Sequence, residues 1–280
     1  TVADSDESEL AEMMVGHSVS FRAGKKPARP GDLILKFENL TVTSSRGIQA
    51  VRDLSLEVRA AEIVGIAGVD GNGQSELVAA IAGLLPVKSG RIYFKGGDIS
   101  QESIRGRNVL GMGLVPEDRH KHGLIPDFRL DENLILKSYN RPPFSNRLGF
   151  LQFPAIVKNA ENLIAEFDIR AGNGPATLAA SMSGGNQQKL IIAREIGLSP
   201  ELLIVSQPTR GLDVGAIEYI HSRIIAERDK GRAVLLVSFE LDEILGLCDR
   251  IAAISKGQIA GVFNAGDVDE RRIGAMMGGI

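Results

Sequence analysis

The amino-acid sequence predicts an α/β domain with a mainly parallel sheet, and three observations lead to this prediction. Short β-rich runs alternate with helical patterns from Leu33 onward. A glycine-rich turn joins one apolar run directly to a helical pattern, as in strand-turn-helix units. From about residue 127 the apolar spacing becomes helical, as in AIVKNAENLIAEF, which predicts an inserted helical subdomain over about residues 127–197.

The individual elements follow from the order of apolar and polar residues. Runs that are rich in β-branched residues predict strands at LSLEV, EIVGIAG, RIYFKG, ELLIVS and AVLLVS. The segment RIAAISKGQIAGVF predicts a closing hairpin, which adds an antiparallel part to the fold. Helical patterns cover about residues 75–84 and 215–230. The second helix places four isoleucines on one face, which we interpret as core packing: Ile217, Ile220, Ile224 and Ile225.

The composition is that of a globular chain with no membrane-crossing run. Of the 280 residues, 44% are hydrophobic, which is ample for a sizeable core. The net charge is only −3 and no basic stripe is present, so we expect no nucleic-acid partner. The single cysteine, Cys248, is typical of a reducing compartment. Neither an apolar run of about 18 residues nor a signal-peptide layout is visible, so we expect a cytoplasmic protein that reaches a membrane only through a partner.

The first 31 residues differ in character from the rest. Residues 17–31 are polar and contain prolines, which predicts a linker ending near Gly31. Residues 1–16 resemble the C-terminus: when Met13-Met14 are aligned with Met276-Met277, three acidic residues and a glycine also match. One interpretation is a chance likeness of two short acidic-then-apolar helices. The other is a tandem repeat, in which residues 1–16 are the tail of a preceding copy and residues 32–280 form the second.

The segment GVDGNGQSEL has the frame of a phosphate-binding loop. It follows an apolar strand and opens a helix, where backbone N–H groups and the helix dipole attract an anion. Gln74 stands where such a loop carries its lysine, and an amide can donate to a phosphate but cannot neutralise it. A glycine turn used only for packing is the alternative interpretation. The candidate phosphate-binding residues are Gly68, Gly71, Asn72, Gly73, Gln74 and Ser75.

Two further motifs give this loop a family context. The segments MSGGNQQKL and ELLIVSQPTRGLD follow it in an order and spacing that resemble the nucleotide-binding domain of ATP-binding cassette (ABC) proteins, over about residues 32–280. MSGGNQQ resembles the signature of that family, QPTRGLD ends in its D-loop at Asp213, and VPEDR lies at its Q-loop. The resemblance implies a P-loop NTPase-type core and ATP as the nucleotide. NQQK and TRGLDVGA resemble the ATP-binding subunits of sugar-type importers, which carry two cassettes on one chain. EDRHKHGL, together with SQPTRGLDVGAIE, is most similar to the second cassette of the branch associated with nucleoside uptake.

The same resemblance implies that the residues of hydrolysis are replaced. The P-loop lysine, the Walker B aspartate and its neighbouring glutamate, the Q-loop glutamine and the switch histidine correspond to Gln74, Ser206, Gln207, Glu117 and Phe239. Each such loss typically lowers a rate by about 10²–10⁴. Ser75 remains a weak candidate ligand for magnesium, without an aspartate to help it. We therefore expect this site to bind ATP weakly or without hydrolysis.

The signature, in contrast, is intact, and the resemblance implies a role for it. In ABC dimers each ATP lies between the P-loop of one cassette and the signature of the other. The signature here would therefore complete the ATP and magnesium site of a first cassette on the same polypeptide; its residues are Ser183, Gly184, Gly185, Asn186 and Gln187. The implied further partners are transmembrane permease subunits, contacted near Glu117 and the helical insert, and indirectly a solute-binding protein, with the chain at the inner face of the cell membrane.

Two other functions stay open from the sequence. One is an ABC-type protein that acts on ribosomes or DNA, although basic arms, coiled-coil inserts and metal clusters are not visible. The other is an active ATPase with a relocated base, either Glu117 or Glu240. The turn RHKH at 119–122 is interpreted as a solvated loop, and Lys189 either contacts nucleotide or faces solvent. An aromatic residue that would stack on adenine is not evident near Ser45-Arg46.

Overall fold

The computed structural model describes residues 25–279, in which the strands form two sheets. The larger sheet has the strand order β10-β9-β3-β8-β7-β6, and its neighbours pair in parallel except for the β9–β10 hairpin. Its strands are β3 (Ile63–Ala67), β6 (Met112–Val115), β7 (Leu202–Ser206), β8 (Ala233–Ser238), β9 (Arg250–Ser255) and β10 (Gln258–Asn264). The prediction of a mainly parallel sheet with an antiparallel addition is confirmed.

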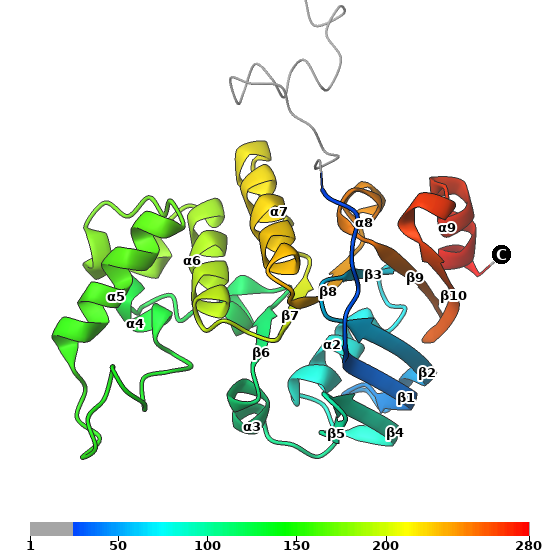
Figure 1. The fold of residues 1–280 in the computed structure, drawn as a ribbon, viewed down its shortest axis with the longest axis horizontal. Helices are drawn as coiled ribbons and strands as arrows, with labels where there is room; N and C mark the ends of the chain where they lie inside the picture. Colours follow the sequence, from blue (N-terminus) through cyan, green and yellow to red (C-terminus); the bar gives the residue numbers. More distant parts are fainter. Residues whose placement is uncertain (1–24, 280) are drawn as a thin grey trace, which may run out of the picture.

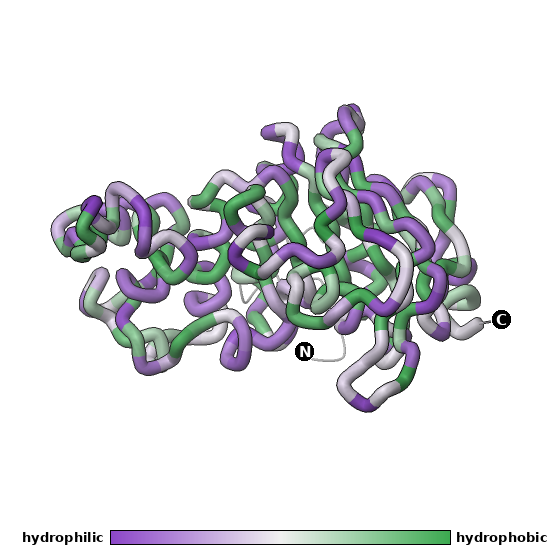
Figure 2. The backbone as a smooth tube through the Cα atoms, turned by 90° about the horizontal axis from the view of Figure 1, so that it is seen from below, coloured by the Kyte–Doolittle hydropathy of each residue, from purple (hydrophilic) through white to green (hydrophobic). Residues whose placement is uncertain are grey.

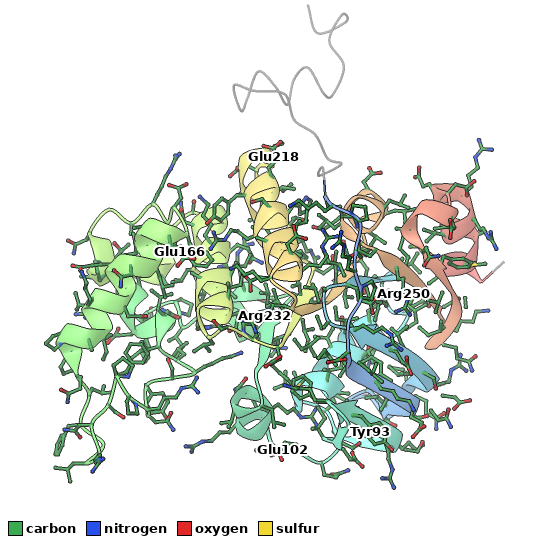
Figure 3. The ribbon with its side chains drawn as sticks, in the orientation of Figure 1. Tyr93, Glu102, Glu166, Glu218, Arg232 and Arg250 are labelled. Carbon is green, nitrogen blue, oxygen red and sulfur yellow. The ribbon has the colours of Figure 1, made fainter. Side chains whose placement is uncertain are left out.

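The smaller sheet is wholly antiparallel, with the strand order β2-β1-β4-β5. Its strands are β1 (Leu33–Thr43), β2 (Gln49–Arg59), β4 (Val87–Phe94) and β5 (Gly97–Asp98). Arg250 of β9 joins the two sheets, because its guanidinium contacts Glu62 Oε1 at 3.0 Å and the carbonyl oxygen of Glu57 in β2 at 3.4 Å; Figure 3 labels this residue.

The helices divide between the sheets and a separate helical part. The helices α2 (Gln74–Ala82), α3 (Ile104–Val109), α7 (Val214–Asp229), α8 (Leu241–Leu247) and α9 (Glu270–Gly278) surround the strands. The helices α4 (Leu130–Leu134), α5 (Phe153–Glu166) and α6 (Gly184–Gly197) lie at the opposite end of the molecule from the antiparallel sheet (Figure 1). Glu166 of α5 pairs with Arg223 of α7 at 2.9 Å, which ties the helical part to the core. No helix within residues 25–279 is long and apolar enough to cross a membrane.

The hydrophobic core lies on both faces of the parallel sheet. Successive residues of β8 point to opposite faces, so Val234 and Leu236 join one buried cluster while Leu235 and Val237 join the other. The first cluster packs the sheet against helices, including Ile220 and Ile224 of α7; the second packs it against α2 and the antiparallel sheet. In Figure 2 the apolar segments accordingly lie mostly inside the molecule, and the polar segments lie mostly on the outer turns.

This arrangement sets where a site can form. The carboxyl ends of β3, β7 and β8 meet at one edge of the sheet, and a loop follows each of them. Open α/β sheets bind ligands at such an edge. The N-terminal likeness at residues 1–16 lies outside the described residues, as does most of the expected linker at 17–31. From the remainder of the expected linker, Lys25 pairs with Asp249 at 2.8 Å.

Candidate functional site

The glycine loop between β3 and α2 is shaped by close backbone approaches. Gly71 and Gly73 have φ angles of +83° and +99°, which glycine adopts without strain. A side-chain carbon on Gly73 would lie 2.2 Å from the carbonyl oxygen of Ala50, and one on Gly68 would lie 2.3 Å from Gln74 Nε2. A carbon on Gly71 would meet nothing within 4 Å. The loop is thus closed on its protein side and open at Gly71, which fits a cradle for an anion at the start of α2.

Gln74 occupies the inside of this loop. Its side chain is only 2% exposed, and its Nε2 donates to the carbonyl oxygen of Val69 at 3.2 Å. The Oε1 atom is buried and has no hydrogen-bond partner within residues 25–279. The amide is therefore directed into the loop, and this position supplies no positive charge to a phosphate.

Asn72 anchors the loop to the C-terminal part of the chain. Its Nδ2 donates to the carbonyl oxygen of Met277 at 3.3 Å, and its Oδ1 accepts from the backbone N–H of Lys256 at 2.9 Å. Its carbonyl oxygen accepts from the backbone N–H of Gly257. These contacts give Asn72 a structural function in holding the loop against the β9–β10 turn.

Ser75 is exposed at the mouth of the loop and contacts Glu117. Its Oγ donates to Glu117 Oε2 at 3.0 Å, and the other carboxylate oxygen accepts from Arg210 Nη1 at 3.0 Å. A hydroxyl and a carboxylate are oxygen ligands of the kind that magnesium prefers, so these two residues fit that ion. Within residues 25–279 no group of three or more His, Cys, Asp or Glu side chains could hold a metal.

The three remaining positions at which we expect a catalytic residue to be replaced meet at the same edge of the sheet. Ser206 ends β7 and is 2% exposed. Gln207 follows it with a φ of +49°, and its Oε1 accepts from the backbone N–H of Phe239, which follows β8, at 3.3 Å. The structure thus brings Ser206, Gln207 and Phe239 together with the glycine loop, and none of them is a carboxylate or an imidazole.

The expected signature residues lie at the start of α6 and not at the glycine loop. Ser183 occupies the N-cap position of α6, and Figure 1 shows the strands β6 and β7 between α6 and α2. The Ser183 hydroxyl accepts from Asn186 Nδ2 at 2.9 Å and forms no capping bond to the helix backbone. A side-chain carbon on Gly185 would lie 3.1 Å from Ala216 Cβ, so Gly185 packs closely on α7 and a larger residue there would push Ala216 by a few tenths of an ångström. Asp213 caps α7 by accepting from the backbone N–H of Ala216 at 2.9 Å.

Several neighbours of the signature are not evident from sequence patterns. The RHKH turn is a π-helical turn whose Arg119 lies beside Gly184 and donates to the carbonyl oxygen of Arg210 at 3.4 Å. His120 Nε2 lies 2.9 Å from Gln187 Oε1. The interpretation of this turn as a solvated loop is therefore incomplete, because it also braces the signature. The residues in these contacts are far apart in the chain, so no local pattern in the sequence indicates them.

Lys189 neither faces solvent freely nor is directed at the glycine loop. Its Nζ pairs with Asp168 at 2.7 Å and lies 4.4 Å from the centre of the Tyr219 ring. Hydrogen bonding to Lys189 holds the pKa of Asp168 below its ordinary value. Lys189 is a structural residue that joins α6 to α7 and to the turn after α5.

Comparison with known proteins identifies the family. The family model described as ABC transporter matches residues 51–210. A guanosine import ATP-binding protein of Bacillus subtilis is 51% identical over 99% of this chain and 54% of its own length. A nucleoside import ATP-binding protein of Lactococcus lactis is 52% identical over the same shares, and a glucose import ATP-binding protein of Haloferax volcanii is 42% identical over 100% of this chain and 51% of its own length. The chain thus spans about half the length of these curated relatives.

Solved structures support the fold. A nucleotide-free ATP-binding cassette of an ABC transporter superposes with a TM-score of 0.72, at 21% identity, over 88% of this chain and 96% of the other. A dimeric bacterial ABC transporter cassette superposes with a TM-score of 0.69, at 23% identity, over 83% and 99%. The family model, the relatives and the fold agree: this chain is an ATP-binding domain of the ABC transporter family.

Proposed function

We propose that this domain is the second of two ATP-binding cassettes in the subunit that powers a nucleoside or simple-sugar importer, and that its own ATP site does not hydrolyse. Relatives named for guanosine, nucleoside and glucose import support the solute class. Nearly half of each relative is unmatched, which leaves room for another domain of similar size. The likeness of residues 1–16 to the C-terminus supports a preceding copy of this domain.

The observation that carries the proposal is the charge at the glycine loop. Gln74 is directed inward to Val69, and the Ser75 hydroxyl contacts the Glu117 carboxylate, which is paired with Arg210. A triphosphate entering this loop therefore meets no lysine, and the charge of Arg210 is already engaged by Glu117. Ser75 and Glu117 would hold a magnesium ion, which would supply part of the missing positive charge. Ser206 and Gln207 lack the carboxylates that hold magnesium and activate water, so binding without turnover is the expected behaviour.

The signature supports a function in a partner's site. The N–H groups of the first turn of α6 receive no capping bond from Ser183 and lie next to the small residues Gly184 and Gly185. Such an open N-terminus favours an anion, and the cationic Arg119 lies beside it. These residues would therefore contact the γ-phosphate of ATP that the opposing cassette binds, with magnesium at that partner site.

A groove beside α3 supports attachment to permease subunits. Ile104, Val109 and Tyr139 are 47%, 70% and 54% exposed there, and the exposed Arg105 and Arg141 line the same groove, whose volume is about 570 Å³. Apolar side chains flanked by cations fit an amphipathic helix with acidic residues. Through this contact the domain would be peripheral to the inner face of the membrane, with a solute-binding protein acting on the far side.

ATP hydrolysis by the isolated chain tests the silent site. We expect no turnover above background from the 280-residue chain, and a titration with ATP analogues in magnesium should reveal weak binding or none. The variant Ser206→Asp with Gln207→Glu supplies the two missing carboxylates and is the comparison against which any turnover by the native residues is judged. Vigorous hydrolysis by the unmodified chain would contradict the proposal and favour a relocated base at Glu117 or Glu240. Capture of permease subunits, as opposed to ribosomes, tests the transport assignment.

A further inference from the structure

A second pocket opens beside the glycine loop, between the turns that follow β7 and β8. It has a volume of about 650 Å³, and we call it the acidic pocket. The lining residues that matter here are Asp70, Gln207, Phe239, Glu240, Asp242 and Glu243. Because they come from the glycine loop, the two turns and α8, the pocket exists only in the folded domain.

The acidic pocket carries uncompensated negative charge. Asp70, Glu240 and Asp242 are exposed, and none of them forms an ion pair with another residue between 25 and 279. The two basic side chains in its lining are already engaged: Arg210 pairs with Glu117 at 3.0 Å, and His221 Nε2 lies 2.7 Å from Glu243 Oε1. An anionic ligand such as a phosphate is repelled here, and a cation is attracted.

Buried polar atoms give a second, independent indication of a ligand. Glu243 is 6% exposed; its Oε1 accepts from Thr209 Oγ1 at 3.0 Å, whereas its Oε2 has no partner within the described chain. Gln207 is also 6% exposed, and its Nε2 likewise has no partner there. A buried carboxylate oxygen without a donor is costly, so a donor that enters the pocket would stabilise it.

We propose that the acidic pocket binds an arginine side chain of the opposing cassette. A guanidinium offers five N–H donors in a planar fork that matches carboxylates, and its flat face stacks on aromatic rings such as Phe239. Leu212 and Ile217 in the lining would cover the apolar stem of that side chain. The choice of occupant rests on the proposed function, because the pocket adjoins the glycine loop, on the side where the opposing cassette would lie.

The ligand chemistry is testable on the isolated 280-residue chain. N-acetyl-arginine amide serves as the probe and N-acetyl-citrulline amide as its neutral isostere, with binding followed by NMR shifts of the Leu212 and Ile217 methyl groups. We expect saturable shifts with a dissociation constant of about 1 mM for the arginine probe and none for citrulline. The double variant Glu240→Gln with Asp242→Asn should weaken binding about tenfold. The matched variant Glu161→Gln with Asp127→Asn removes two exposed charges elsewhere and should leave it unchanged.

Equal shifts with both probes, or an equal loss in the matched variant, would overturn the proposal.

The partner assignment is tested in the complete transporter with a thiol introduced by Asp242→Cys, since the native Cys248 is fully buried. ATP with magnesium should slow alkylation of that thiol at least about tenfold, and should not slow alkylation of one introduced by Glu161→Cys. Unchanged alkylation at position 242 refutes the opposing cassette as the source. Neither test measures hydrolysis by the isolated chain, so failure here and failure of the silent-site proposal are distinguishable.

Discussion

The substitution Gly184→Asp tests whether the signature acts on ATP bound by the opposing cassette. In this domain a side-chain carbon at position 184 lies 3.0 Å from Arg119 Nη2, and that guanidinium is the mobile end of a long side chain. The fold should therefore tolerate the change. The new carboxylate would stand at the start of α6, where the γ-phosphate is expected.

The size of the effect follows from Coulomb's law. Two unit charges about 5 Å apart at an effective dielectric constant of about 20 repel by about 3 kcal/mol. This corresponds to roughly a 10²-fold loss of ATP-driven closure, since each 1.4 kcal/mol is tenfold in an equilibrium constant. Pairing of the new carboxylate with Arg119 would return at most about 1 kcal/mol, the usual value for an exposed ion pair. A loss of at least tenfold should therefore remain.

The assay is ATP hydrolysis by the complete subunit together with its permease, with thermal melting of the isolated chain as the control for folding. Gly184→Ala adds the same first carbon without the charge, and we expect it to retain hydrolysis within about threefold. Equal losses for Ala and Asp would mean that packing and not charge decides the effect. A greater loss from Gln74→Ala than from Gly184→Asp would reverse the assigned functions of the two motifs.

Three further predictions concern buried groups. Gln74→Ala should lower the free energy of unfolding by about 1–3 kcal/mol in denaturant titration, because it removes a buried amide and its bond to Val69, yet it should leave subunit hydrolysis nearly unchanged. Burial acts to raise the pKa of Glu195, but Lys137 and Arg194 outweigh it and hold that pKa below its ordinary value of 4.5. Glu195→Gln should therefore cost about 3–5 kcal/mol at neutral pH, and in denaturant titrations repeated at lower pH this difference should shrink as the carboxylate of the native chain becomes protonated. Burial raises the pKa of the Cys248 thiol, so it should react with a thiol reagent at pH 8 only as fast as the chain unfolds, and stability should decline as pH rises past the ordinary value of 9.0. A fast reaction in the folded chain, or a Glu195→Gln deficit that is independent of pH, would contradict these assignments.

Local periodicity was sufficient for most of the fold. The run AVLLVS corresponds to β8 over Ala233–Ser238, and the hairpin expected from 250–263 corresponds to β9 and β10. The helix expected at 75–84 ends at Ala82, because Gly83 adopts a left-handed conformation with a φ of +80° and caps it. Short elements without a strong pattern, such as α3 and β6, were not predicted. Their placement depends on contacts distant in the chain: Arg107 of α3 donates to backbone oxygens of α2, and β6 packs against β7 and α6.

The sequence by itself determined which side chains stand at the positions where we expect the catalytic residues of the family. If the proposed correspondence holds, Gln74, Ser206, Gln207, Glu117 and Phe239 replace a lysine, two carboxylates, an amide and an imidazole of the family pattern. Order and spacing along the chain likewise indicated the glycine loop and the expected signature, because each is a short local segment that opens a helix.

Only the tertiary structure decided what surrounds those positions. The contacts of Ser75 with Glu117 and of Glu117 with Arg210 span 42 and 93 residues. The hydrogen-bond contacts of Thr209 and His221 with Glu243 join three separate segments of the chain. Such contacts are set by which strands are neighbours in the sheet and by where their carboxyl ends meet, and no local pattern encodes that. For the same physical reason the inward direction of Gln74 and the acidic pocket beside it became visible only in the folded domain.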